Sequence, residues 1–240
     1  MRRADPWADG PLLPPGWRPD REEPRDDSDD HRWVVVDPGG HLRLVDGTDI
    51  LLRPIRPGDG NLLAAGFDRL SARSRYRRFL APMPVLTDSM LAFLTSVDGF
   101  NHRAWGAVID EQAGPAGPPS GARLSPAGVV RWVRTRREPV VADFAVTVID
   151  DYQGRGLGGL LLDVAVLDAF ACGVEHFEGL VLGENIASRR MLARGGATLQ
   201  PDGGGVFSFR LELRPRVERL RTSPLSTVVA TQSRRAGLVA

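Results

Sequence analysis

Lysine is missing from this sequence: all 31 basic residues of the 240-residue chain are arginines. Mechanisms that need a lysine side chain are therefore excluded, among them Schiff-base catalysis and the phosphate-binding lysine of a P-loop. Cysteine is almost absent as well. Because Cys172 stands alone, the chain forms neither an internal disulfide nor a cysteine-based zinc site, and its place at the end of an apolar run predicts a buried, inert thiol.

Long apolar segments and a large excess of charge are also lacking. No uninterrupted run of about 18 apolar residues predicts a membrane span. Aspartates and prolines interrupt the first residues, so no signal peptide is readable and we expect a cytoplasmic protein. The formal net charge of +1 argues against a dominant nucleic-acid-binding face, so neither a membrane nor a specific nucleic acid is an expected partner.

The two ends of the chain differ in composition from its middle. Residues 1–30 carry 5 Arg and 9 acidic residues in a Pro-rich context, and such a segment lacks the apolar residues that would offset the entropy of ordering. Residues 214–240 carry 6 Arg and one Glu in a Ser/Thr/Pro-rich context, which is typical of a solvated basic tail, although such a tail can also touch nucleic acid or a membrane. We therefore expect two disordered tails around one domain, residues 31–213.

Strand-like and helix-like patterns alternate within residues 31–213. A hairpin is predicted around the turn at 37–40, and a third strand at 50–52. Helices are predicted after Asp59 and from Ser71 to Phe79, with Asp59 and Ser71 as their N-caps, and a third helix is predicted to start at Thr87. Strands at 105–109 and 128–133 follow, joined by a Gly/Pro-rich loop, and the nearly all-apolar segment 140–149 predicts a central strand covered on both faces.

A glycine-rich loop follows this central strand and leads into a helix. Four glycines lie within residues 154–159, and an apolar face then recurs at helical spacing through Leu160, Val164, Leu167 and Ala171, with Gly173 ending the helix. Glycines let the backbone turn tightly, and the free N–H groups and positive dipole end of a helix N-terminus favour phosphate. The loop has the form of a pyrophosphate cradle; the alternative is a tight strand-to-helix turn without a ligand.

A dinucleotide reading of the same loop must be considered. Gly154, Gly156 and Gly159 satisfy the G-x-G-x-x-G fingerprint, with Glu175 or Glu178 about twenty residues further on. That fingerprint belongs in the first strand-to-helix turn of a doubly wound sheet. Here most of the domain precedes the loop, which leaves no room for the second half of such a sheet, so binding of NAD(P) is the weaker alternative.

The loop also matches the coenzyme A motif of the GCN5-related N-acetyltransferases (GNAT), Gln/Arg-x-x-Gly-x-Gly/Ala, over Gln153–Gly158. The similarity extends over residues 31–213, through the segments 52–59, 70–79, 142–146 and 184–187. Together these segments resemble the actinobacterial branch related to Pat-type protein lysine acetyltransferases. The resemblance implies an α/β (α+β) fold with a mixed, mostly antiparallel central sheet flanked by helices, and acetyl-CoA between two diverging strands.

The resemblance also implies which residues would bind acetyl-CoA as the acetyl donor. The strand backbone would bond the pantetheine amides, the loop amides would hold the pyrophosphate, and Asn185 would approach the pantetheine end; these positions are Val146, Thr147, Val148, Gln153, Gly154, Arg155, Gly156, Leu157, Gly158, Gly159 and Asn185. Asn185 has a second reading, compatible with the first, as the N-cap of a helix with Ser188 three residues later.

Acetyl transfer to an amine needs a group that removes the amine's proton. In the Pat-like branch a glutamate serves, and the matching position here is Asp143, shorter by one C–C bond of about 1.5 Å; a water relay would restore its reach. The alternative for Asp143 is a structural ion pair. The only tyrosines, Tyr76 and Tyr152, do not occupy the position of the family's general acid, so none is assigned. A non-catalytic acetyl-CoA sensor or partner-binding module is therefore the rival to an N-acetyltransferase acting on a protein lysine or small amine.

Arginines are dense on the segment that would overlie the acceptor, at positions 69, 73, 75, 77 and 78. Arginine binds carboxylate and phosphate bidentately, so the run suits an acidic acceptor or the coenzyme's 3′-phosphate, or else forms a solvated helix face. His102 and His176 lack metal-ligand spacing, and no metal is expected.

Overall fold

The computed structural model describes residues 33–110 and 124–238. The expected N-terminal tail, residues 1–30, and most of the predicted Gly/Pro-rich loop lie outside the described residues. No helix within the described part is long and apolar enough to cross a bilayer.

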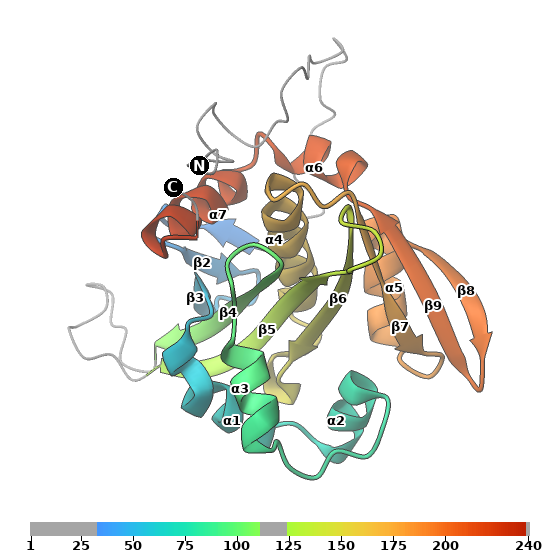
Figure 1. Ribbon diagram of the computed structural model, residues 1–240. Coiled ribbons are helices and arrows are strands. Elements are labelled where there is room, and N and C mark those ends of the chain that lie inside the picture. Colours follow the sequence, from blue (N-terminus) through green and yellow to red (C-terminus); the bar gives the residue numbers. More distant parts are fainter. Residues whose placement is uncertain (1–32, 111–123, 239–240) are drawn as a thin grey trace.

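A nine-stranded sheet forms the centre of the described chain (Figure 1). Its order is β1-β2-β3-β4-β5-β6-β7-β9-β8, and only β6 and β7 pair in parallel. This confirms the predicted mixed, mostly antiparallel sheet, and one parallel pair is not a doubly wound arrangement. The strands are β1 (Trp33–Val35), β2 (His41–Leu44), β3 (Asp49–Pro54), β4 (His102–Asp110), β5 (Leu124–Arg134), β6 (Val141–Val148), β7 (His176–Leu182), β8 (Thr198–Gly203) and β9 (Val206–Glu212).

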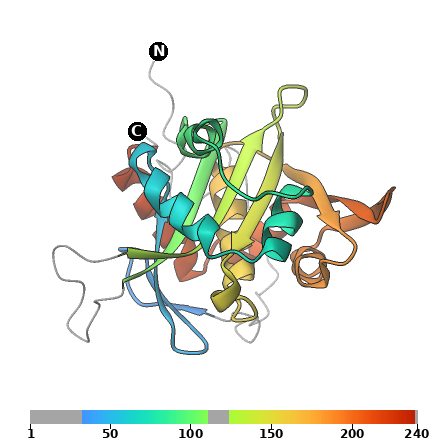
Figure 2. The ribbon, with the colours of Figure 1, turned by 90° about the horizontal axis from the view of Figure 1, so that it is seen from below.

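Helices cover both faces of the sheet (Figures 1 and 2). One face carries α1 (Gly60–Asp68), α2 (Ala72–Phe79) and α3 (Asp88–Thr95), preceded by the 3₁₀ turn η2 (Pro57–Asp59). The other carries α4 (Leu157–Ala171), α5 (Ile186–Gly195), α6 (Arg214–Leu220) and α7 (Pro224–Arg235). A second 3₁₀ turn, η3 (Asp150–Tyr152), links β6 to the loop before α4.

Local capping chemistry explains where the short helices begin. The Ser71 hydroxyl accepts a hydrogen bond from the Ser74 N–H at the start of α2, as predicted. Thr87 accepts one from the Met90 N–H at the start of α3, where a helix was predicted to begin. Asp59 precedes α1 but does not cap it with its side chain. Its carboxylate accepts two bonds of 2.7 Å from the Arg53 guanidinium instead.

Helix α4 is buried on every side, so the prediction of one apolar face is incomplete. Buried positions run through the whole helix and include Asp163 and Asp168. The Asp163 carboxylate accepts a hydrogen bond from Arg216 of α6, and Asp168 pairs with the fully buried Arg103 of β4. Its charged positions thus bind arginines of neighbouring elements rather than water, as buried charges require.

The expectation that residues 214–240 form a disordered tail is wrong. Residues 214–235 form α6 and α7, which pack on α4 and bury Val217, Leu220, Leu225, Val228 and Val229. The Ser/Thr/Pro-rich composition concealed an amphipathic pattern, because Pro224 stands at the first turn of α7, where its missing N–H costs nothing. The folded unit therefore continues past residue 213.

A buried polar cluster joins α7 to the sheet. Asp168 accepts hydrogen bonds from Arg103 and, at 2.8 Å, from the Trp132 indole N–H, while Arg103 donates to the Ser233 hydroxyl at 3.0 Å. These residues come from four elements, so the pair fixes α4 and α7 against β4 and β5.

We predict that Leu225→Ala lowers the free energy of unfolding by about 2–5 kcal/mol, because the side chain is fully buried between α7 and the core. Thr227→Ala, on the exposed side of the same helix, should change it by less than about 0.5 kcal/mol. Urea titration followed by circular dichroism measures both. Equal, small effects would mean that α7 does not pack on α4 in solution.

Candidate functional site

Strands β6 and β7 part soon after they begin to pair. Their parallel register contains three residue pairs, of which Asp143 with Glu178 is the last, although β6 continues to Val148 and β7 to Leu182. On its other side β6 stays paired with β5 through Val148. The β7-facing backbone of β6 beyond Asp143 therefore borders a gap, and backbone groups there need another partner.

The residues predicted to bind pantetheine lie on this divergent part of β6. Val146 and Val148 pack against the core on the α4 side of the sheet, while Thr147 faces a cavity on the α1 side. The segment thus has both side-chain faces engaged by the protein, and its backbone edge is the part turned toward the gap.

The loop after β6 turns in the way that the glycines predicted. Gly154 and Gly156 have φ of +77° and +91°, a left-handed conformation that residues with a Cβ rarely adopt. Gly156 is the N-cap of α4, and its carbonyl accepts from the N–H groups of Gly159 and Leu160. Gly158 lies against Met191 of α5, where a Cβ would come within 3.3 Å of the sulfur.

The N-terminus of α4 has no side-chain cap. Helices α2, α3 and α5 are capped by the side chains of Ser71, Thr87 and Asn185. The 15-residue α4, like α1, α6 and α7, has no such cap; its N-cap is a glycine, and its first turn has no acidic residue. The first N–H groups of a helix lack intrahelical acceptors and carry partial positive charge. Such an end is suited to an external anion.

Side chains on both sides hold this loop in place. The Gln153 amide donates to the Val148 carbonyl at 3.0 Å and to the Ser74 hydroxyl at 3.3 Å. The Tyr152 ring lies between two guanidinium groups, those of Arg69 at 5.5 Å and Arg155 at 5.4 Å. The loop is therefore preorganised by the protein itself.

Helix α2 bridges the two strands where they diverge. At its N-terminus, the Asp150 carboxylate after β6 accepts 2.8 Å bonds from the hydroxyls of Ser71 and Ser74. Further along, Arg77 and Arg73 reach Glu184 after β7 at 3.1 and 3.5 Å. These contacts tie α2 to both sides of the gap. They involve two arginines of the basic run, for which the sequence allowed either ligand binding or a solvated helix face.

Asp143 lies at the point of divergence. Its side chain is exposed and shares a sheet face with Thr147, two pleats along β6. Partial burial and the negative charge of the neighbouring Glu178 raise its pKa. Glu178 itself pairs with Arg210 of β9, so the structure places the candidate base beside an engaged carboxylate, with no ion pair to Asp143 among the described residues.

Asn185 caps α5, where its side-chain oxygen accepts from the Ser188 N–H at 3.3 Å, so its capping role is confirmed. Burial raises the pKa of the Cys172 thiol to about 12, in agreement with an inert thiol. Tyr76 lies on the exposed side of α2.

The sequence did not predict the partners of Asp143 and Asp150. The Glu178–Asp143 contact depends on a parallel register between strands 35 residues apart, counted from their numbers. The Asp150–Ser74 tie joins residues 76 apart. The sequence indicates that Ser71 is a helix cap and that Asp150 follows a strand. No local pattern predicts that the two residues form a hydrogen bond.

Comparison with known proteins places the chain beside acetyltransferases. It is 34% identical over 164 residues to the Acetyltransferase Pat of Mycolicibacterium smegmatis, covering 68% of this chain and 46% of that relative. The chain thus spans less than half of the relative's length. No family model matches the chain.

Solved structures show the same fold. The GNAT domain of S. lividans PAT aligns with a TM-score of 0.63 at 24% identity, over 75% of this chain and 99% of that one. The structure of YncA from Salmonella typhimurium with its cofactor acetyl-CoA aligns with a TM-score of 0.53 at 16% identity, over 68% of this chain and 94% of that one.

The raised pKa of Asp143 gives a testable pH dependence. Because folding disfavours its ionised form, this carboxyl destabilises the fold once the pH rises through its folded-state pKa. We predict that Asp143→Asn raises the Tm at pH 7 and that the gain disappears below about pH 4, near the unfolded pKa.

Asp49 provides a control of opposite sign. The hydrogen bond from Arg43 lowers its pKa, so Asp49→Asn should lower the Tm at pH 7, with the loss fading as the pH falls. Calorimetry from pH 3 to 8 measures both variants. A Tm for Asp143→Asn below that of the parent at pH 7 would contradict the environment assigned to Asp143.

Proposed function

Since the chain belongs to the family of GCN5-related N-acetyltransferases, we propose that it transfers an acetyl group from acetyl-CoA directly to an amine. The observation that carries the proposal is the combination of strands β6 and β7, which part after three residue pairs, with an uncapped helix N-terminus at the end of the gap. The other neighbouring strands of the described sheet pair antiparallel.

Acetyl-CoA fits the groups that border this gap. The backbone of Val146, Thr147 and Val148 would bond the pantetheine amides, as an added strand does at a sheet edge. Within the loop from Gln153 to Gly159, the amides from Arg155 to Gly158 would hold the pyrophosphate, because the uncapped end of α4 supplies positive potential there. The amides of Gln153 and Gly159 already donate to the carbonyls of Asp150 and Gly156. Asn185 would contact the pantetheine end while it caps α5. The bound coenzyme supplies a thioester as the acetyl donor.

The reaction then needs a neutral amine next to Asp143. The amine nitrogen attacks the thioester carbonyl, a C–N bond forms and the C–S bond breaks, which yields an amide and the coenzyme thiol. One proton leaves the nitrogen and one is taken up by the thiolate. We assign proton removal to Asp143 acting through a water molecule, because its raised pKa makes it a stronger base than an isolated aspartate and its side chain is one methylene shorter than a glutamate. No residue is assigned as the general acid.

Two questions separate the alternative functions: which amine is the acceptor, and whether the protein catalyses transfer at all. Protein lysine, a small amine, an amino acid and an aminoglycoside are all amines that the chemistry admits. A non-catalytic acetyl-CoA sensor or partner-binding module is the rival, motivated by the short base and by Tyr152, which lies between two arginines rather than beside Asp143. Thiol release measured over these acceptor classes tests the proposal. Tight acetyl-CoA binding without thiol release for any class would favour the sensor.

The absence of lysine makes the test with protein acceptors unambiguous. Because the chain itself has no ε-amino group, every acetyl-lysine detected after incubation belongs to the acceptor protein.

We predict that Gly156→Ala weakens acetyl-CoA binding at least about tenfold, because a Cβ in the left-handed loop strains the backbone that faces the phosphates. Gly173→Ala is the matched control, since Gly173 has φ of +81° with nothing near its Cβ position, at the other end of the same helix. Both variants should lose similar stability, but only Gly156→Ala should lose affinity.

Isothermal titration with acetyl-CoA and with NAD measures this effect. Equal affinity losses in the two variants would assign the effect to stability alone, and NAD binding without acetyl-CoA binding would overturn the proposed function.

We predict that Asp143→Asn lowers turnover at least about tenfold and changes acetyl-CoA affinity by less than about threefold, because it removes the base and leaves the coenzyme loop intact. Asp143→Glu should retain turnover, since its carboxylate reaches further into the site. Steady-state thiol release from pH 6 to 9 is the measurement. Unchanged turnover of Asp143→Asn over that range would remove Asp143 from the mechanism.

A further inference from the structure

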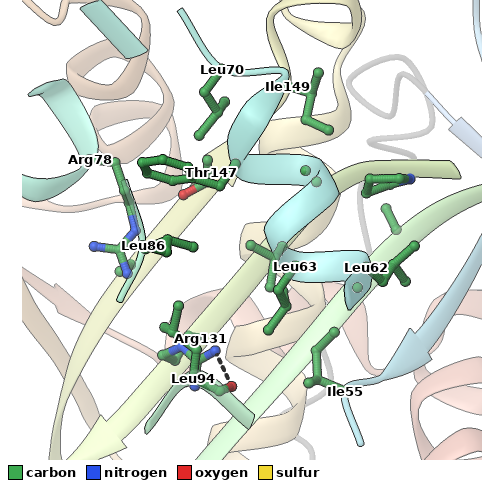
Figure 3. Close-up of a pocket in the computed structure, with 18 of the residues that line it drawn as sticks. Ile55, Leu62, Leu63, Leu70, Arg78, Leu86, Leu94, Arg131, Thr147 and Ile149 are labelled. Carbon is green, nitrogen blue, oxygen red and sulfur yellow. Dashed lines mark hydrogen bonds between the residues drawn. The ribbon is translucent and has the colours of Figure 1, made fainter. Parts of the chain in front are cut away.

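A mostly apolar cavity of about 80 Å³ lies between the sheet and helices α1 to α3 (Figure 3). This is roughly half the volume of a 150 Å³ cavity that binds benzene, so it suits a short aliphatic group. It lies on the Asp143 face of the sheet, since Ala145 and Thr147 of β6 both line it. Its other walls include Leu62, Leu63, Leu70 and Val129.

Two arginines, Arg78 of α2 and Arg131 of β5, also line this apolar cavity (Figure 3). Among the described residues, no carboxylate forms an ion pair with either guanidinium. Burial lowers the pKa of Arg78. Burial, together with the positive charge of Arg78, lowers the pKa of Arg131 to about 10. A guanidinium keeps its proton in proteins, so both groups are cations at neutral pH. Two like charges thus line one mostly apolar cavity, with Arg131 buried and Arg78 half-buried, and a bound anion would relieve their repulsion.

Neutral groups hold Arg131 in position. Its guanidinium donates to the Leu94 carbonyl at 2.7 Å and contacts the Nε2 atom of His102. His102 is 7% exposed and stacks on Phe93, with ring centroids 5.0 Å apart, and burial followed by Arg131 lowers its pKa. A neutral imidazole accepts from the guanidinium without cancelling its charge.

In the described part of the chain, the other arginines of α2 have carboxylate or carbonyl partners, unlike Arg78. Arg73 and Arg77 pair with Glu184, and Arg75 donates to three backbone carbonyls of neighbouring segments. The Arg78 guanidinium makes no such bond within the described residues and lies 5.1 Å from the ring centroid of the neighbouring Phe79.

We propose that this cavity binds the carboxylate of a small aliphatic acceptor, such as a free amino acid, with Arg78 and Arg131 as the carboxylate ligands. The inference rests on the proposed function and names its acceptor class. Guanidinium groups bind carboxylates in a bidentate manner, and the aliphatic walls accommodate the side chain. A lysine ammonium, by contrast, would meet two positive charges here.

The sheet register places Asp143 in reach of such an acceptor. His102, Val133 and Asp143 lie in one row across β4, β5 and β6, with side chains on the cavity face. Two strand spacings, about 9–10 Å, separate the backbones at the ends of that row. A carboxylate at Arg131, which contacts His102, and an amine at Asp143 would match the dimensions of one amino acid with a hydrogen bond at each end.

Binding of 4-methylpentanoate and of its neutral amide, 4-methylpentanamide, tests the cavity without acetyl transfer. We expect the carboxylate to bind at least about tenfold more tightly than the amide, and Arg78→Met to abolish that preference. Arg73→Met, an exposed arginine of the same helix, should leave the preference within about twofold. Equal affinity for acid and amide, or a preference that survives Arg78→Met, would overturn the proposal.

Thermal unfolding of the variants provides a second readout. Because Arg78 has no counter-ion, Arg78→Met should keep or raise the Tm, whereas addition of 4-methylpentanoate should raise the Tm of the parent chain only. A large fall in the Tm of Arg78→Met would show that the arginine is a structural partner, and would contradict the proposal.

Thiol release with L-leucine and with L-leucinamide separates this inference from the proposed function. Leucine turned over in preference to leucinamide supports both. Carboxylate binding without thiol release from any amine would retain the cavity assignment and reject the transferase. Thiol release from other amines, without carboxylate binding, would reject the cavity assignment alone.

Discussion

The organisation of this protein depends on two parallel strands that pair for only three residues. After Asp143 and Glu178, β6 keeps β5 as its partner and loses β7, so a backbone edge inside the sheet borders a gap. At the end of that edge the chain turns through left-handed glycines into α4, whose N-terminus has no side-chain cap. Unpaired strand backbone and an uncapped helix are each unfavourable alone. Under the proposed function, a ligand with amides at one end and phosphates at the other would satisfy both.

Helix α2 spans the place where the two strands diverge. It is tied to the segment after β6 through Asp150 and to the segment after β7 through Glu184. Its arginines therefore serve different purposes, some as structural ties and one, Arg78, as an uncompensated charge beside Arg131 in the cavity under α1. The arginines of α2 look alike in the sequence, but the fold gives them different contacts. Arg73 and Arg77 pair with Glu184, whereas Arg78 lines the cavity.

Much of this was predictable because its causes are local. The first hairpin, the caps at Ser71 and Thr87, the central strand and the glycine loop follow from turn chemistry, periodicity and φ requirements that neighbouring residues carry. The C-terminal helices were missed because their composition is polar and their stability comes from packing on α4. The same contact explains why α4 is buried on every side: α6 and α7 cover it, and Asp163 and Asp168 find arginines there. The pairing of Asp143 with Glu178 and the isolation of Arg78 depend on register and tertiary packing, which the sequence does not display.

The most direct test of the account is to follow the backbone amides of the ¹⁵N-labelled chain while acetyl-CoA is added. Occupation of the gap predicts that the amide signals of residues 146–148 and 153–159 shift together and exchange more slowly with solvent, while those of the β1–β2 hairpin stay unchanged. Acetyl-CoA that leaves these two segments unperturbed, or that shifts only signals elsewhere in the chain, would contradict the placement of the donor between β6 and β7.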